Sequence, residues 1–410
     1  MAAAVLGRRF WRFWSASLTS NLSDGVALIA LPWITTTVTD EAFLVGAVAA
    51  AGRLPWLVAA IPAGAAIDRL PRFATMAAAA TVRALLWAGL GLVAVTGRLS
   101  LEALLVVAFA LGLAEVFYDT AAVTAIPRLV ARGHLETANG QFRTAEITAQ
   151  EFLGRPAGGL VLTAGTAPAL FLNAGICALV PALLLRLCRD EHREPRLADD
   201  RDSGWRRFGA GIATIRASPL LRRLVGVTML FNLAYATVLA TQVLFARTTL
   251  GLGSAQFGLL MLTAAAGGIL GGQFGGRVAA RLPAGWLPMT GLAGTGICHL
   301  VMAAAPVVPV VAVMLFVSHA CVLLYTVSVS ALRQRVTPAA LLGRVNAAAG
   351  TASWGVATVG MAAGGGLVSL AERWLTASDA LRVPHALTAA VLLALVCTVG
   401  RSTTRLSAQV

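Results

Sequence analysis

Residues 74–95 read ATMAAAATVRALLWAGLGLVAV, an apolar run of 22 residues that contains a single charge, Arg83. A helix of this length can cross a bilayer's hydrocarbon core, which is about 30 Å thick. Runs of the same character and similar length occur at residues 101–126, 167–187 and 308–331. Backbone groups in lipid must be hydrogen-bonded within their own segment, so each run is predicted to be a transmembrane helix.

Composition extends this prediction to the whole chain. Of the 410 residues, 58% are hydrophobic and 12% charged, whereas soluble domains have roughly 45–50% apolar and about 25% charged residues. The five cysteines are scattered, so neither a disulfide framework nor a metal site is predicted, and no cofactor is expected. The basic N-terminus leads into an apolar run that continues to Thr36, which indicates a retained first helix rather than a secretory signal. We predict an all-α integral membrane protein with about twelve transmembrane helices.

The distribution of arginines decides between a nucleic-acid binder and a membrane protein, because the formal net charge is +14. Arginines gather in alternate loops between the predicted spans, for example at Arg69/Arg72, Arg128/Arg132, Arg277/Arg281 and Arg333/Arg335/Arg344. By the positive-inside rule, both termini and the central loop are cytoplasmic, and nucleic acid is not an expected partner. Enrichment in alanine and arginine without lysine indicates a GC-rich bacterial genome, and hence a bacterial plasma membrane.

One long polar segment, residues 186–223, divides the chain into two halves of six spans each. We predict an N-terminal bundle over residues 1–187, a cytoplasmic central loop over 188–221 and a C-terminal bundle over 222–410. Within the loop, Trp205, Phe208, Ile212 and Ile215 recur at helical spacing beside arginines. This pattern suits an amphipathic helix on the inner leaflet, and equally suits a linker that only carries positive-inside charge.

The two halves contain similar short motifs at corresponding positions between their predicted spans. GAAIDRLPR at residues 64–72 follows the second span, and GRVAARLP at 276–283 follows the eighth. Likewise RLV at 128–130 precedes Leu135 and Asn139, and QRV at 334–336 precedes Leu341 and Asn346. Two homologous halves are typical of secondary transporters, which rock them around a central site.

At residues 64–72 the chain resembles the major facilitator superfamily, whose loop signature between helices two and three is G-x-x-x-D-R-x-G/P-R. The resemblance in span order, central loop and repeat covers essentially the whole chain. It implies that Gly64, Asp68, Arg69 and Arg72 form a gating motif that contacts neighbouring helix ends and stabilises the outward-facing closure. Ala280 replaces the acid in the second copy, so only the N-terminal half carries this latch. The alternative for Asp68 is an ion pair confined to the loop.

The fifth span contains GRPAGG at residues 154–159, which resembles the G-P-x-x-G-G motif of family members that export by antiport. Proline stands one place late, and an arginine occupies its usual position. The residues of this antiport-like motif are Gly154, Arg155, Pro156, Gly158 and Gly159. Small residues also let helices pack closely, so a hinge and a simple packing seam both remain open. NLSD at 21–24 and PRLV at 127–130 resemble the macrolide-efflux and siderophore-export branch.

Ionisable side chains at membrane depth are costly and therefore mark candidate functional sites. Asp24 lies 12 residues after Arg12, about 18 Å along a helix and near the midplane. The carboxylates predicted to bind a proton or the substrate are Asp24, Glu115, Asp119, Glu146 and Glu151. Arg143 can pair with Glu146 and Arg155 with Glu151 within one helix, whereas Arg53 and Arg83 can neutralise Glu115 or Asp119 across helices. The alternative is a buried ion-pair network without transport chemistry.

The second half contains no Asp or Glu at depth, so carboxylate-based proton coupling is predicted only in the first half. Its polar groups, with Asn21 of the first half, are candidates to line the cavity: Asn21, Asn232, Tyr235, Gln242, His319 and Tyr325. For His299 and His319 we expect hydrogen bonds to neighbouring helices instead. The many alanine, leucine and valine residues suit a bulky, largely apolar substrate.

These features together predict a monomeric, proton-coupled exporter of a drug-like or secondary-metabolite molecule, which works by alternating access. The expected partners are a small-molecule substrate, protons and the lipid bilayer. No phosphate-binding loop of the form G-x-x-x-x-G-K-[ST] is present, and no nucleophile motif indicates an enzyme. The alternatives are a proton-coupled uptake transporter and a membrane sensor or scaffold with the same fold.

Overall fold

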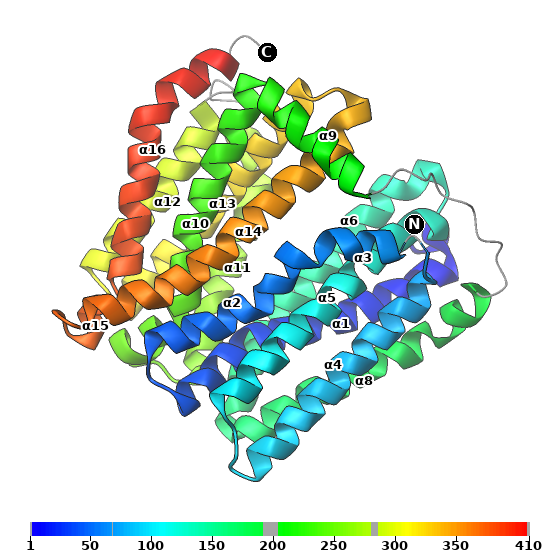
Figure 1. Cartoon of the computed structure of the whole chain (residues 1–410), viewed down its shortest axis with the longest axis horizontal. Helices are drawn as coiled ribbons and strands as arrows, with labels where there is room; N and C mark the ends of the chain where they lie inside the picture. Colours follow the sequence, from blue (N-terminus) through cyan, green and yellow to red (C-terminus); the bar gives the residue numbers. More distant parts are fainter. Residues whose placement is uncertain (1, 68, 192–203, 280–285, 408–410) are drawn as a thin grey trace. The chain divides into compact units, whose positions relative to one another are not determined.

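The computed structural model describes residues 2–67, 69–191, 204–279 and 286–407, and every element in these ranges is helical (Figure 1). The chain shows locally why its helices begin and end where they do. Helix α4 (Arg72–Val95) begins after Pro71 and is followed by Gly97, whose φ of +67° suits a residue without a Cβ. Helix α5 (Leu101–Leu129) then begins at Ser100, whose hydroxyl accepts a hydrogen bond from the backbone N–H of Ala103 at 3.2 Å.

The chain divides into two compact units. Unit 1 comprises Met1–Thr39, Ala51–Gly204 and Ser254–Leu259. Unit 2 comprises Asp40–Ala50, Trp205–Gly253 and Leu260–Val410. Unit 1 therefore includes Ser254–Leu259 from the second half of the chain, and unit 2 includes Asp40–Ala50 from the first half.

The first half of the chain supplies the helices of unit 1. These are α1 (Ala2–Val38), α2 (Ala42–Val58), α3 (Ala60–Ile67), α4, α5, α6 (Leu135–Ile147), α7 (Arg155–Val161) and α8 (Thr166–Glu191), with α2 beginning in unit 2. Helices α2 and α3 form one span, because Ala59 N–H donates to Pro55 O at 2.7 Å and Ala63 N–H donates to Ala59 O at 2.8 Å. The segment η2 (Thr148–Gly154) is a π-helix that joins α6 to α7.

The second half supplies the helices of unit 2. These are α9 (Gly204–Ala217), α10 (Pro219–Leu244) with its π-helical extension η4 (Phe245–Thr249), α11 (Ser254–Ala279), α12 (Trp286–Ala304), α13 (Val308–Val336), α14 (Ala339–Ala371), α15 (Ala377–Ala380) and α16 (Val383–Ser407). Helix α9 covers the segment predicted to be amphipathic. A Cβ at Gly211 in α9 would lie 2.2 Å from the carbonyl oxygen of Arg344 in α14, so the two helices approach closely there.

The packing pattern inside one unit recurs inside the other. In unit 1, α4 packs on α5 and α8, and α1 packs on the segment from α6 to α7. In unit 2, α12 packs on α13 and α16, and α10 packs on α14. In span order, the third span contacts the fourth and sixth, the ninth contacts the tenth and twelfth, and the first and seventh contact the fifth and eleventh. The internal repeat in the sequence therefore corresponds to a repeat of helix packing.

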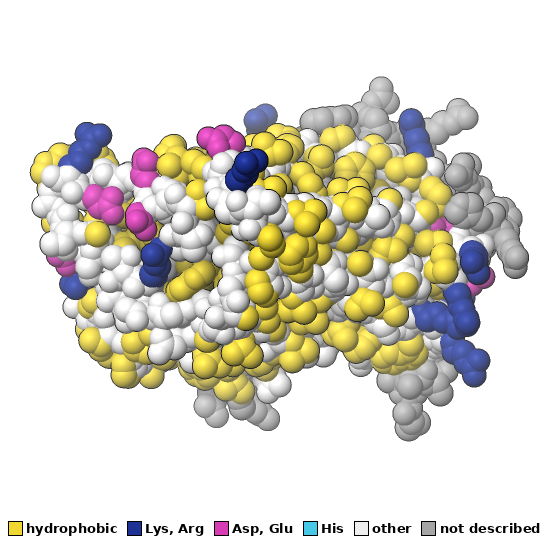
Figure 2. All heavy atoms as spheres, turned by 90° about the horizontal axis from the view of Figure 1, so that it is seen from below, with side chains coloured by type: hydrophobic (Ala, Val, Ile, Leu, Met, Phe, Trp, Pro, Cys, Tyr) yellow, Lys and Arg dark blue, Asp and Glu magenta, His cyan; other side chains and the backbone are white. Residues whose placement is uncertain are grey.

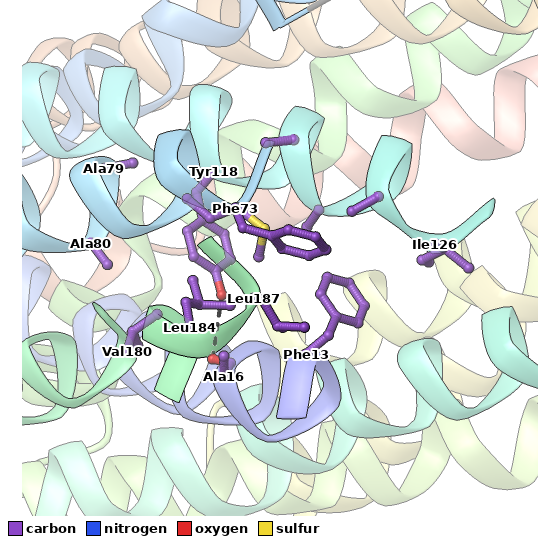
Figure 3. Packing of buried hydrophobic residues seen from close by; sticks show 14 of the residues in the cluster. Phe13, Ala16, Phe73, Ala79, Ala80, Tyr118, Ile126, Val180, Leu184 and Leu187 are labelled. Carbon is purple, nitrogen blue, oxygen red and sulfur yellow. Dashed lines mark hydrogen bonds between the residues drawn. The ribbon is translucent and has the colours of Figure 1, made fainter. Parts of the chain in front are cut away.

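A hydrophobic cluster packs residues of α1, α3, α4, α5, α6 and α8 together in unit 1, and Figure 3 shows part of it. Phe13 of α1 lies edge-on to Phe73 of α4, with ring centroids 6.4 Å apart. Tyr118 of α5 is buried beside Leu184 of α8, and its hydroxyl donates to the backbone oxygen of Ala16 at 3.3 Å. The same helices carry most of the charged side chains of the candidate site, so this core sets their positions.

The surface of the protein is that of a membrane protein. Nine described helices are long and apolar enough to cross a bilayer, and α2 is a shorter apolar helix. Figure 2 shows broad expanses of hydrophobic side chains on one face, with few charged side chains among them. Leu85 and Val106 are each 67% exposed, which is costly in water and favourable in lipid.

Candidate functional site

The centre of unit 1 contains an ion pair between Asp24 of α1 and Arg83 of α4. Both side chains are buried. Arg83 also donates to the hydroxyl of Ser20 at 3.0 Å and to that of Ser23 at 3.4 Å. It lies 11 residues after Arg72 and 12 before Val95, so it is about 17 Å from one end of α4 and about 18 Å from the other.

A second ion pair lies beside the first. Arg53 of α2 donates to Glu115 of α5 at 3.3 Å, and both side chains are half-buried. Asp119 follows one helical turn after Glu115 on the same face of α5. It interacts electrostatically with Glu115, Asp24 and Arg83, and it has no hydrogen bond or ion pair within the described residues. The three acids and two arginines therefore form one charge cluster in unit 1.

Two further pairs are local, as the spacing predicts. Arg143 pairs with Glu146 in α6, and Arg155 pairs with Glu151 at 2.9 Å across the end of the π-helix. The prediction for Arg83 was wrong in its partner: its salt bridge is to Asp24, and it reaches Glu115 and Asp119 only through longer-range electrostatic interaction. Asp24 is nearer because α1 and α4 both pack on α8, and because two serines of α1 hold the guanidinium in place.

The gating segment is described on both sides of Asp68, which itself lies outside the described residues. Gly64 lies in α3 with open space where a Cβ would lie, and Arg69 is exposed in the turn that follows. Arg72 is buried at the start of α4 and donates from Nε to the hydroxyl of Thr124 in α5 at 3.3 Å.

A residue that the sequence analysis missed anchors this segment. The carboxylate of Glu191, at the end of α8, accepts the backbone N–H of Arg72 at 2.6 Å and that of Phe73 at 2.9 Å. Pro71 precedes the helix and supplies no capping side chain, so Glu191 satisfies two of the open donors of α4 from a distant helix. Only the charge type of Glu191 is visible in the sequence, because its partners lie 118 and 119 residues away.

The antiport-like motif lies at the junction of a π-helix and α7. Pro156 cannot donate a backbone hydrogen bond, and the π-helical turn immediately before it accommodates that loss. A Cβ at Gly154 would lie 2.6 Å from the Cα of Gly25, and one at Gly158 would lie 3.1 Å from the Cα of Val26. Gly159 meets the start of α11, whose residues 254–259 belong to unit 1. The motif is therefore a seam of backbone contact with α1.

The polar groups predicted to line a cavity have mixed surroundings. Asn21 is buried and donates to Ser17 O at 2.8 Å. Tyr325 is also buried, and its hydroxyl lies 2.9 Å from that of Thr228. Asn232 and Gln242, both in α10, are half-buried.

Histidines of unit 2 form a second polar cluster. His319 Nε2 lies 3.3 Å from the hydroxyl of Tyr235, and His299 Nδ1 lies 3.0 Å from His385 Nδ1. Both predicted histidines thus bond to neighbouring helices, as expected. The analysis of the sequence missed His385, because nothing local links it to a residue 86 positions earlier. No group of three or more metal-ligating side chains was found among the described residues.

Each unit is a bundle of apolar helices, the two bundles share one packing pattern, and charged side chains lie at mid-span in unit 1. These features define a multi-pass membrane protein of the transporter class. The chain belongs to the Major Facilitator Superfamily, whose family model matches residues 13–361. The protein is therefore a membrane transporter. It is similar to the multidrug efflux pump Tap of Mycolicibacterium fortuitum, with 27% identity over 375 residues that cover 87% of this chain and 88% of the relative.

Solved structures agree on the fold. A bacterial homologue of the human lysosomal transporter Spinster has a TM-score of 0.75 at 15% identity, over 98% of this chain and 96% of its own. A bacterial homologue of the iron transporter ferroportin has a TM-score of 0.77 at 14% identity, over 97% and 98% of the two chains. At these identities the likeness concerns the fold alone.

Proposed function

We propose that this transporter is a proton-coupled exporter of a drug-like or secondary-metabolite molecule. The observation that carries the proposal is the charge cluster in the middle of unit 1, made by Asp24, Arg83, Arg53, Glu115 and Asp119. Charges at membrane depth are expensive, and a carboxylate there can bind and release a proton as its surroundings change. A proton gradient then drives the conformational cycle.

The direction of transport rests on two supports. The similar protein of Mycolicibacterium fortuitum is a multidrug efflux pump, and it aligns over most of both chains. Gly154 and Gly158 place the fifth span in backbone contact with α1, which suits the antiport-like motif as a hinge beside Asp24. The apolar composition of the second half suits a bulky, hydrophobic substrate.

Alternating access supplies the mechanism. In this proposal the bundles 1–187 and 222–410 rock about a central site, with residues 188–221 as the cytoplasmic loop. Asp68, Arg69 and Arg72 gate the closure, and Glu191 holds the helix end on which Arg72 lies. The protein acts as a monomer in a bacterial plasma membrane with both termini in the cytoplasm.

Inverted membrane vesicles test the proposal. Vesicles with the native chain, and with Asp24→Asn or Asp68→Asn, are energised to an acidic interior and given a panel of dyes and antibiotics. We expect the native chain to drive accumulation of at least one compound, and both substitutions to reduce it. A matched control is Asp190→Asn, which removes a carboxylate outside the charge cluster.

Other outcomes favour the alternatives. Accumulation in right-side-out vesicles with an inward proton gradient, and none in inverted vesicles, would indicate an uptake transporter. Purified, folded protein that binds panel compounds but moves none in either orientation would indicate a sensor or scaffold.

A further inference from the structure

Two buried histidines pair near one end of unit 2. His299 Nδ1 lies 3.0 Å from His385 Nδ1, and the two residues are 1% and 2% exposed. His299 lies five residues before Ala304, the last residue of α12, and His385 is the third residue of α16. These helices lie side by side (Figure 1). Each histidine is thus within about 8 Å of a helix end, on the side that the positive-inside rule predicts to be extracytoplasmic.

The hydrogen bond fixes where the protons of the neutral pair lie. One imidazole has its proton on Nδ1 and donates it, whereas the other has a bare Nδ1 and therefore carries its proton on Nε2. Both Nε2 atoms are buried, and neither has a hydrogen-bond partner within the described residues. The neutral pair can therefore accept one more proton, on the bare Nε2 of the donor ring, and that proton leaves the Nδ1 hydrogen bond in place.

The groups that face the pair are aromatic or neutral. The ring of Phe245, in η4, lies 4.6 Å from that of His385, and the ring of Tyr235, in α10, meets His299 edge-on at 5.6 Å. From α13, His319 bonds to the Tyr235 hydroxyl. No carboxylate interacts with either imidazole of the pair within the described part of the chain.

The charged groups at this end of unit 2 have partners of their own. Arg247 of η4 pairs with Asp40 at 3.5 Å, and Arg382, just before α16, pairs with Asp379 at 3.5 Å. Glu372, after the last residue of α14, interacts electrostatically with another acid rather than with the histidines. A proton added to the pair therefore creates a positive charge in an apolar interior without a counter-ion, which is costly.

His385 is the ring that can relieve this cost by reaching water. Its helix begins only two residues earlier, after a loop whose residues 372–377 are exposed. When His385 moves, Phe245 loses its ring contact. Phe245 begins the π-helical end of α10, and Thr249 at the other end of that π-helix donates to Ser378 O at 3.3 Å. Movement at the start of α16 is therefore transmitted to the end of α10.

We propose that His299 and His385 form an acid-sensitive latch between α12 and α16. With both imidazoles neutral the latch is closed, and uptake of one proton opens it. The closed form is accordingly stable above the pH at which the pair takes up a proton and is lost as the pH falls below it. Because the pair lies at the predicted extracytoplasmic end, the latch responds to acidity outside the cytoplasm. It acts on α10, which also carries the candidate cavity residues Asn232, Tyr235 and Gln242.

Hydrogen exchange measured by mass spectrometry tests the latch. The purified native chain in detergent is compared with the double variant His299→Asn/His385→Asn at about pH 8 and about pH 5, which bracket the titration of histidine. An asparagine amide can donate and accept a hydrogen bond near the position of Nδ1, but it takes up no proton in this range. Comparison at equal pH cancels the intrinsic dependence of exchange on pH.

The expected difference is local and appears only in acid. At about pH 8 residues 245–253 and 383–392 should exchange equally in the two proteins. At about pH 5 they should exchange about tenfold faster in the native chain, because the latch opens more often. Helix α4 of unit 1 should exchange equally at both pH values. The control His134→Asn, which removes an exposed histidine of unit 1, should keep the native response, as should His319→Asn.

Two results overturn the proposal: equal exchange of the native chain and the double variant at about pH 5, and loss of the acid response in either single-histidine control. If the double variant does not fold, His385→Lys decides. Its permanent charge should give fast exchange of both segments at both pH values, and slow exchange at about pH 8 contradicts the latch. The measurement needs no transported compound, so a chain that exports nothing in vesicles defeats the proposed function and leaves the latch standing.

Discussion

The carboxylate of Glu191 gives a prediction whose size follows from its geometry. It accepts two backbone N–H groups at the start of α4, at 2.6 and 2.9 Å. In Glu191→Gln the amide retains one acceptor oxygen but places an NH₂ group against the second donor, so one charge-assisted hydrogen bond is lost. Such a bond contributes about 1.5–3 kcal/mol, and the lost charge at a helix N-terminus roughly 0.3–1 kcal/mol more.

Because Glu191 is half-buried, we take the lower part of that range, about 2 kcal/mol. For a cooperative unit of roughly 200 residues this lowers the melting temperature by about 4–8 °C. Thermal unfolding of the purified protein in detergent, followed by intrinsic fluorescence, measures the shift. The matched control is Asp190→Asn, the same change of charge one residue earlier at a side chain with no hydrogen bond or ion pair in the described structure. Equal shifts for the two variants would refute the reasoning.

Three further predictions concern the same unit. A Cβ at Gly25 would lie 2.3 Å from a backbone oxygen of the fifth span, so Gly25→Ala should destabilise the protein by about 1–3 kcal/mol. The control Gly140→Ala should not, because nothing lies within 4 Å of a Cβ at that position. Thermal unfolding of the two variants compares them. Asp24→Asn leaves the buried Arg83 without its partner and should lower the melting temperature, which a normal melting curve would contradict. Asp119 is half-buried, and Asp119→Asn should reduce proton-driven accumulation in inverted vesicles with little change of the melting temperature, so undiminished accumulation would contradict a role for this carboxylate in coupling.

The features that sequence predicts well are the local ones. The length of an apolar run determines whether it can span a bilayer, so the run that begins at residue 74 became α4 without reference to the rest of the fold. Pairs at i,i+3 and i,i+4 are equally local, and Arg143 with Glu146 and Arg155 with Glu151 lie where helical spacing places them. The internal repeat also predicts that the helices of each half pack in the same pattern.

What the sequence could not specify depends on which helices are neighbours. The sequence predicted Glu115 or Asp119 as the partner of Arg83, and only the packing of α1 and α4 on α8 brings Asp24 to it. Glu191 and His385 meet partners that are about a hundred residues away along the chain. Pro156 does not by itself predict the π-helix that precedes it, because that π-helix requires the fifth span to continue through the proline.

Opposed fluxes of substrate and protons test the central claim most directly. Proteoliposomes with the purified chain are loaded with an acidic buffer and an internal pH dye, and then placed in a neutral buffer with an accumulated compound from the vesicle panel. We predict that the compound enters against its concentration gradient while protons leave faster than in liposomes without protein. Movement of the compound and protons in the same direction, or substrate movement that is indifferent to the pH gradient, would contradict proton-coupled export.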